Sequence, residues 1–280
     1  NSTITTLTNN DTISGTAGDD NGQGIVLLRT STITTLTNDG TISGTAVGTL
    51  GAGILVDSSS TLTTLTNDGT ISGTAATKGV GVVVDNTSTL TTLTNTGTIT
   101  GTSTGNESAG INVTDNSTLT TLTNNGTISG TAASSGYGFF IDQTSTLTTL
   151  INSGTITGTA TGDVGYGIFA ENTTTITTLT NTGTITGTAA TNAFDIKVDA
   201  TSNLTNFNNL QPNLTYSGRL PGNYSTIIRN LDNYGSVTFS TPTESATGDT
   251  VYTPFAGSAA AAVYIKGGTY SSVMTGMPNG

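Results

Sequence analysis

The sequence predicts an all-β protein: a parallel β-helix, or solenoid, of about seven to eight coils of 28–29 residues with a small C-terminal β cap or domain. A phrase of the type Ser-Thr-Leu-Thr-Thr-Leu-Thr-Asn, followed by Gly-Thr-Ile-Ser-Gly-Thr-Ala, recurs throughout the first 189 residues. Within each copy, apolar and polar residues alternate with the period of two expected of β-strands. The second leucine of the phrase lies at Leu7, Leu36, Leu65, Leu93, Leu122, Leu150 and Leu179.

Residues 60–87 illustrate how one coil is expected to form. Leu62 and Leu65 are three positions apart, so a bend or bulge between them is expected to turn both side chains inward. The Asn-Asp-Gly turn at 67–69 separates the first strand from a second strand that ends near residue 75. A variable connection is expected at 76–81, followed by a third strand with Val82 and Val84 inward.

One asparagine ends the first strand of every coil and is expected to point inward at a corner. A stacked asparagine can bond the backbone of its own turn and the amide of the next coil, so the sequence predicts a structural ladder. The column comprises Asn9, Asn38, Asn67, Asn95, Asn124, Asn152 and Asn181.

The repeat domain is expected to span residues 1–209, because Phe207 and Asn209 keep the phase of a degenerate eighth coil. Residues 210–280 break the period and predict a β cap or second domain, since an open solenoid end exposes unpaired strand edges. Candidate strands in this part are Tyr224–Arg229, Gly235–Ser240, Val251–Thr253, Ala261–Lys266 and Thr269–Met274.

The composition narrows the function classes. Only 8% of the residues are charged, the formal net charge is −11, and residues 1–200 carry all of the net negative charge. An acidic repeat surface argues against binding to nucleic acid. No apolar run is long enough to span a membrane.

The phrases at 122–130 and 179–187, Leu-Thr-Asn-Asn-Gly-Thr-Ile-Ser-Gly and Leu-Thr-Asn-Thr-Gly-Thr-Ile-Thr-Gly, resemble passenger repeats of autotransporters and other β-helical surface adhesins. The segments at 214–224 and 268–276 are similar to the region that follows such arrays. This resemblance implies a secreted, surface-displayed, right-handed β-helix of Gram-negative type.

The chain contains no histidine and no cysteine, which excludes a conventional catalytic triad. One acidic column follows the third strand of successive coils, with Asp115 one residue out of phase. Turn formation is the structural interpretation of this column. Calcium binding and a glycan-cleaving carboxylate pair are its alternatives. The column comprises Asp57, Asp85, Asp142, Glu171 and Asp199.

Outward threonines such as Thr64, Thr66 and Thr70 are expected to form flat hydroxyl arrays. Thr-x-Thr places hydroxyl groups roughly 7 Å apart along a strand and about 4.8 Å apart between strands. Ice-binding solenoids use such a lattice, so ice binding is one alternative function, although threonine is also a common polar residue in strands.

A further outward column is apolar and is expected to be either an exposed contact surface or a surface covered by the variable loops or the tail. The possible contact stripe comprises Val26, Leu55, Val83, Phe140 and Phe169.

The first coil begins with Asn1-Ser-Thr-Ile-Thr-Thr-Leu, which has the sequence of an internal repeat. The edge of such a coil is expected to be open, and an open β-helix edge can pair with another strand. We therefore expect a non-enzymatic extracellular or cell-surface structural protein without a cofactor. It is either an adhesin passenger that contacts a host, glycan or abiotic surface, or a subunit that associates head to tail into a filament.

Overall fold

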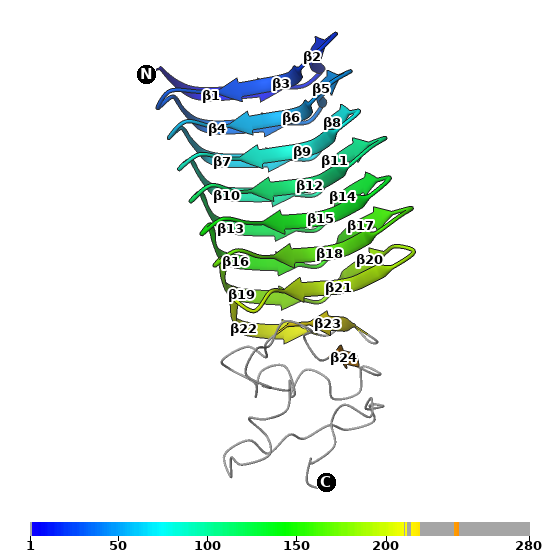
Figure 1. Cartoon of the computed structure of the whole chain (residues 1–280). Coiled ribbons are helices and arrows are strands. Elements are labelled where there is room, and N and C mark those ends of the chain that lie inside the picture. The colour runs from blue at the N-terminus through cyan, green and yellow to red at the C-terminus, as the bar shows by residue number, and fades with distance from the viewer. Residues whose placement is uncertain (1, 210, 212–213, 219–237, 241–280) are drawn as a thin grey trace, which may run out of the picture.

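The protein is a β-solenoid in a computed structural model that describes residues 2–209, 211, 214–218 and 238–240 (Figure 1). All of the elements assigned in these residues are strands, and every pairing between them is parallel. Each complete coil contributes one strand to each of three sheets, here named A, B and C in the order in which the chain visits them. The predicted fold class is confirmed.

The three sheets run along the molecule, and each strand pairs with its counterparts in the preceding and following coils (Figure 1). Sheet A contains β1 (Thr3–Asn9), β4 (Thr32–Asn38), β7 (Thr61–Asn67), β10 (Thr89–Asn95), β13 (Thr118–Asn124), β16 (Thr146–Asn152), β19 (Thr175–Asn181) and β22 (Asn203–Asn209). Sheet B contains β2 (Thr12–Ala17), β5 (Thr41–Ala46), β8 (Thr70–Ala75), β11 (Thr98–Ser103), β14 (Thr127–Ala132), β17 (Thr155–Ala160) and β20 (Thr184–Thr188). Sheet C contains β3 (Asn21–Leu27), β6 (Leu50–Val56), β9 (Lys78–Val84), β12 (Glu107–Val113), β15 (Ser135–Ile141), β18 (Val164–Ala170), β21 (Asn192–Val198), β23 (Thr215–Ser217) and β24 (Thr238–Ser240).

The central core lies between the three sheets and is built from the regularly spaced apolar residues of the repeat. In the third coil, Leu62 and Leu65 of β7, Ile71 of β8 and Val82 of β9 are completely buried. Thr63 has no partner in the register between β7 and β10, which produces the predicted bend and lets both leucines face inward. Because the same residue types recur in every coil, each core position packs against its own copies along the axis.

Sheets B and C approach each other so closely that their contact has no room for side chains. A Cβ atom on Gly73 of β8 would lie 1.9 Å from the carbonyl oxygen of Val80 and 2.3 Å from that of Gly51. Real Cβ atoms do not approach backbone oxygens this closely, so glycine is required here by packing. The same position of sheet B is glycine in all seven coils: Gly15, Gly44, Gly73, Gly101, Gly130, Gly158 and Gly187.

The structure corrects one expected boundary. The connection expected at 76–81 is confined to residues 76–77, because β9 begins at Lys78 and its first residues pair with β6 and β12. The eighth coil is present in part: β22 pairs with β19, with Phe207 opposite Leu179. Most of the 210–280 region lies outside the described residues, including the candidate strands other than the end of Gly235–Ser240, where β24 is found.

Candidate functional site

The asparagine column at the A–B corner is a continuous hydrogen-bonded ladder inside the solenoid. The side-chain Nδ2 of Asn95 donates to Asn124 Oδ1 at 2.8 Å, and Asn124 Nδ2 donates to Asn152 Oδ1 at 2.7 Å. From Asn9 to Asn152, each Nδ2 atom also lies within hydrogen-bonding distance of backbone carbonyl oxygens, as Asn124 does with Gly126 at 3.2 Å and Thr155 at 3.1 Å. These buried amides therefore connect the A–B turn of one coil to the A–B turn of the next coil.

A second ladder, at the C–A corner, was missed from the sequence. The backbone N–H of Ser60 donates to Ser88 Oγ at 3.2 Å, and the N–H of Ser88 donates to Ser117 Oγ at 3.1 Å. These hydroxyl groups are buried. The sequence indicates this ladder by the serine or threonine with which each copy of the repeated phrase begins. The column comprises Ser31, Ser60, Ser88, Ser117, Ser145, Thr174 and Ser202.

The acidic column lies beside this second ladder and holds the turn that follows sheet C. The turns that follow β3, β6, β9, β12, β15 and β18 each contain two successive non-glycine residues with positive φ, as at Gln143 (52°) and Thr144 (59°). Left-handed conformations are unfavourable for such residues, so the turn needs compensating bonds. Asp142 Oδ1 accepts hydrogen bonds from the Gln143 N–H at 2.6 Å and from Asn172 Nδ2 at 2.7 Å. The arrangement favours the turn-forming interpretation of the column.

Carboxyl groups in this column influence one another along the axis. Burial, followed by the nearby Asp142 and Asp199 carboxylates, raises the pKa of Glu171 to about 7. Burial and the neighbouring Asp115 raise the pKa of Asp85 to about 6. Burial opposes ionisation of Asp199 as well, but hydrogen bonds from Asn172, Ser202 and Thr201 leave its pKa lowered. The column is therefore a row of like charges with two members that protonate near neutral pH.

We expect the solenoid to be more stable at pH 5 than at pH 8. Between pH 4.5 and about 7 the folded protein holds a proton on Glu171 that the unfolded chain has released, so the free energy of unfolding falls as pH rises. Glu171→Gln removes the partly buried charge and its repulsion, and is expected to add about 1 kcal/mol at pH 8, after allowance for solvent screening, and much less at pH 5. Denaturant unfolding at both pH values measures this difference.

Asp20→Asn is the matched control, because Asp20 is an exposed carboxylate in the turn before β3. It is expected to leave the pH dependence unchanged. An equal gain from Glu171→Gln at pH 5 and pH 8 would contradict the role of the carboxylate charge.

Within the described residues, no three acidic side chains are grouped closely enough to hold a metal ion. The geometry thus adds no support for calcium binding by Asp57, Asp85, Asp142, Glu171 or Asp199. The same part of the chain contains no helix of the length and apolarity needed to cross a membrane.

The apolar column lies on the face of sheet C opposite the central core, where it forms a second apolar cluster. Of the two expected alternatives, an exposed or a covered surface, the structure shows a largely covered one, since Leu55, Val83, Phe140 and Phe169 are buried and only Val26, at 41%, is exposed. Two contacts bury this column: β3, β6, β9, β12, β15 and β18 each bend at a glycine, so residues three apart face the same side, and rings of neighbouring coils pack on each other. Tyr137 therefore packs on Phe140 with ring centroids 4.8 Å apart. A contact role for this stripe stays a prediction.

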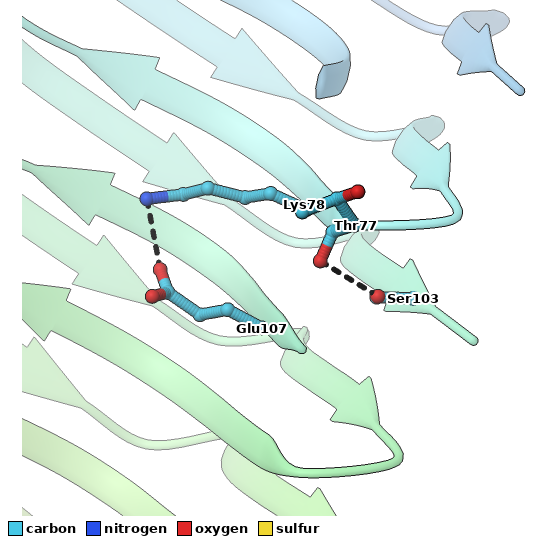
Figure 2. A network of polar contacts seen from close by, with 4 residues as sticks. All are labelled: Thr77, Lys78, Ser103 and Glu107. Carbon is cyan, nitrogen blue, oxygen red and sulfur yellow. Dashed lines mark hydrogen bonds and ion pairs between the residues drawn. The ribbon is translucent and has the colours of Figure 1, made fainter. Parts of the chain in front are cut away.

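Sheet C also carries a polar contact between neighbouring coils near the B–C corner (Figure 2). Lys78 Nζ on β9 lies 2.8 Å from Glu107 Oε1 on β12, and it is the one ion pair found among the described residues. Ser103 Oγ donates to the Thr77 carbonyl oxygen at 2.9 Å (Figure 2). Both charged side chains are about one-third exposed, so the pair contributes little stability and marks no reactive centre.

The outer faces of sheets A and B carry hydroxyl groups and no charged side chains until the chain leaves the strands. On sheet A, threonines pair with threonines from coil to coil, and Thr92 lies between Thr64 and Thr121. This column runs unbroken through Thr6, Thr35, Thr64, Thr92, Thr121, Thr149 and Thr178. The neighbouring column is interrupted by the exposed Ile151.

Comparison with protein-family models finds no match for this chain, and comparisons with curated proteins and solved structures find no significant similarity.

Proposed function

We propose that this protein is a non-enzymatic structural element of the cell surface or extracellular space, a rigid passenger-like rod that displays its outer faces to a surface. The observation that carries the proposal is the pair of buried ladders: the asparagine ladder binds every coil to the next, and the hydroxyl ladder adds bonds between most of them. A solenoid is stabilised by its nearest-neighbour interfaces, and here hydrogen-bonded side-chain columns reinforce them at two corners.

The outer surface also supports a display role. The strands of sheets A and B present in-register hydroxyl groups, while the acidic side chains are concentrated in the turns. A flat, uncharged, hydrogen-bonding face suits contact with a glycan or an abiotic surface better than contact with nucleic acid. The resemblance of the repeats at 122–130 and 179–187 to adhesin passenger repeats agrees with this role.

Electron microscopy of the purified protein at near-physiological salt tests the structural role. Straight, unbranched rods are expected, and compact round particles would contradict the proposal. Long fibres with an axial repeat near one subunit length would select the filament form of the same role. Release of products from a panel of glycans, lost in Asp142→Asn, would instead favour an enzyme.

Ice binding is a second candidate function, favoured by the unbroken threonine column on sheet A. If ice is the ligand, thermal hysteresis should be present and should be lost in Thr121→Tyr, because a bulky ring would interrupt the flat lattice. Thr131→Tyr, on the outer face of sheet B, is the matched control that tells the two faces apart. No hysteresis in the unmodified protein would remove this candidate.

A further inference from the structure

Sheet B ends one coil before its neighbours. In the described residues, sheet A continues from β19 to β22 and sheet C continues from β21 to β23, whereas β20 forms the edge of sheet B. The backbone groups on the free side of an edge strand form a template for pairing with another strand. The end of sheet B therefore needs partners that the repeat does not supply.

Gln211 supplies those partners with its side chain. Its Oε1 accepts a hydrogen bond from the Ile185 N–H at 2.7 Å, and its Nε2 donates to the Ile185 carbonyl oxygen at 2.8 Å. One primary amide thus bonds both backbone groups of a residue in β20. In a parallel ladder, these two bonds would come from the two peptide groups that flank one residue of an eighth strand.

The Gln211 side chain also accepts a hydrogen bond from Asn181, near the C-terminal end of the asparagine ladder. In earlier coils, the asparagine Nδ2 lies near the carbonyl oxygen of a sheet B residue in the next coil, as Asn152 does with Thr184 at 3.3 Å. In the part of the chain that the structure describes, no strand of sheet B follows β20, and Asn181 Nδ2 donates to Gln211 Oε1 at 3.1 Å instead. Gln211 is held in place by Asn209, which accepts from its N–H at 3.2 Å and donates to its carbonyl oxygen at 2.9 Å.

Asp195 supplies a further hydrogen-bond acceptor to the β20 edge, two residues beyond Ile185. Its Oδ1 accepts from the Gly187 N–H of β20 at 3.1 Å, and its Oδ2 accepts from the Thr215 N–H at 2.8 Å. The corresponding position in earlier coils is glycine: Gly24, Gly53, Gly81, Gly110, Gly138 and Gly167.

The reason for this exception is geometric. A Cβ atom on Gly167 would lie 2.5 Å from Ile185 Cγ2 in the following coil. Because sheet B continues no further than β20 in the described residues, no eighth isoleucine among them stands against Asp195, and the space accepts a carboxylate. The aspartate is 8% exposed, so its hydrogen bonds to the edge are shielded from water.

We propose that Gln211 and Asp195 form an edge cap that replaces an eighth strand of sheet B and blocks the stacking of a coil from a second copy of this chain. The cap rests on the proposed structural role and refines it, because it makes the two ends of the array unequal. The β2 edge at the other end has no such side-chain cap among the described residues. The cap favours separate rods over a head-to-tail filament.

The test compares the full chain with Gln211→Ala, Gln211→Asn and Asp195→Gly, the last restoring the residue used in earlier coils. We expect hydrogen exchange at the Ile185 amide to become about tenfold faster in both Gln211 variants, and at the Gly187 amide in Asp195→Gly. Sedimentation velocity should show larger species that increase with protein concentration. Gln143→Asn, at an exposed glutamine in a turn, is the matched control and should change neither measurement.

The outcomes separate this proposal from the broader structural role. Unchanged exchange at Ile185 in Gln211→Ala would overturn the cap itself, and faster exchange without any change in sedimentation would overturn its blocking function. Long fibres of the unmodified protein would also overturn the block while leaving a structural role intact. Compact particles in microscopy would instead count against the rod, whatever the exchange data show.

Discussion

Gly73→Ala is expected to destabilise the solenoid by about 3 kcal/mol or more. The new methyl group would lie 1.9 Å from the Val80 carbonyl oxygen and 2.3 Å from that of Gly51, which belong to successive strands of sheet C. Neither contact can be relieved by rotating a side chain, because both partners are backbone atoms. Sheets B and C would have to separate locally and lose part of their packing.

Gly18→Ala is the control for this substitution. Gly18 lies in the turn between β2 and β3, and a Cβ atom there would have no neighbour within 4 Å. Chemical denaturation of both variants, followed by circular dichroism, measures the difference. Equal stability of Gly73→Ala and Gly18→Ala would show that the contact between sheets B and C is looser than the structure indicates.

Asn124→Ala is the second substitution for which a large loss is expected, about 2–4 kcal/mol. Asn124 is completely buried in the middle of the ladder, accepting from Asn95 and donating toward Asn152. Alanine would leave Asn152 Oδ1 without its donor, remove one of the acceptors of Asn95 Nδ2, and leave a small cavity between them. Native-state hydrogen exchange in the fourth, fifth and sixth coils should show where the loss is concentrated.

The neighbouring Asn125 offers a control with the same chemistry. Its side chain is exposed and accepts one hydrogen bond, from Ser153 Oγ at 2.6 Å, so Asn125→Ala should cost less than about 1 kcal/mol. Asn124→Asp preserves the shape but removes the Nδ2 donor, which tests the ladder apart from the cavity. If Asn124→Asp were as stable as the unmodified protein, the ladder would contribute no net stability.

Much of the local design could be predicted from the sequence because it is repeated. A constant spacing forces parallel pairing in register, and period-two alternation then determines which residues face inward, as for Leu65, Asn67 and Ile71. The serine ladder was present in the same phrase. It was missed because hydroxyl residues are common in this chain, so one buried column of them does not stand out.

The remaining features depend on segments that meet only after folding. The sequence by itself determined the coil, its three strands and its asparagine column, because each is specified within one repeat and copied to the next. Only the tertiary structure decided that Phe140 and Phe169 are buried, since the bend of sheet C brings rings from neighbouring coils together. Only the tertiary structure revealed the cap as well, because Gln211 meets Ile185 26 positions away, where sheet B ends and the repeat no longer supplies a strand.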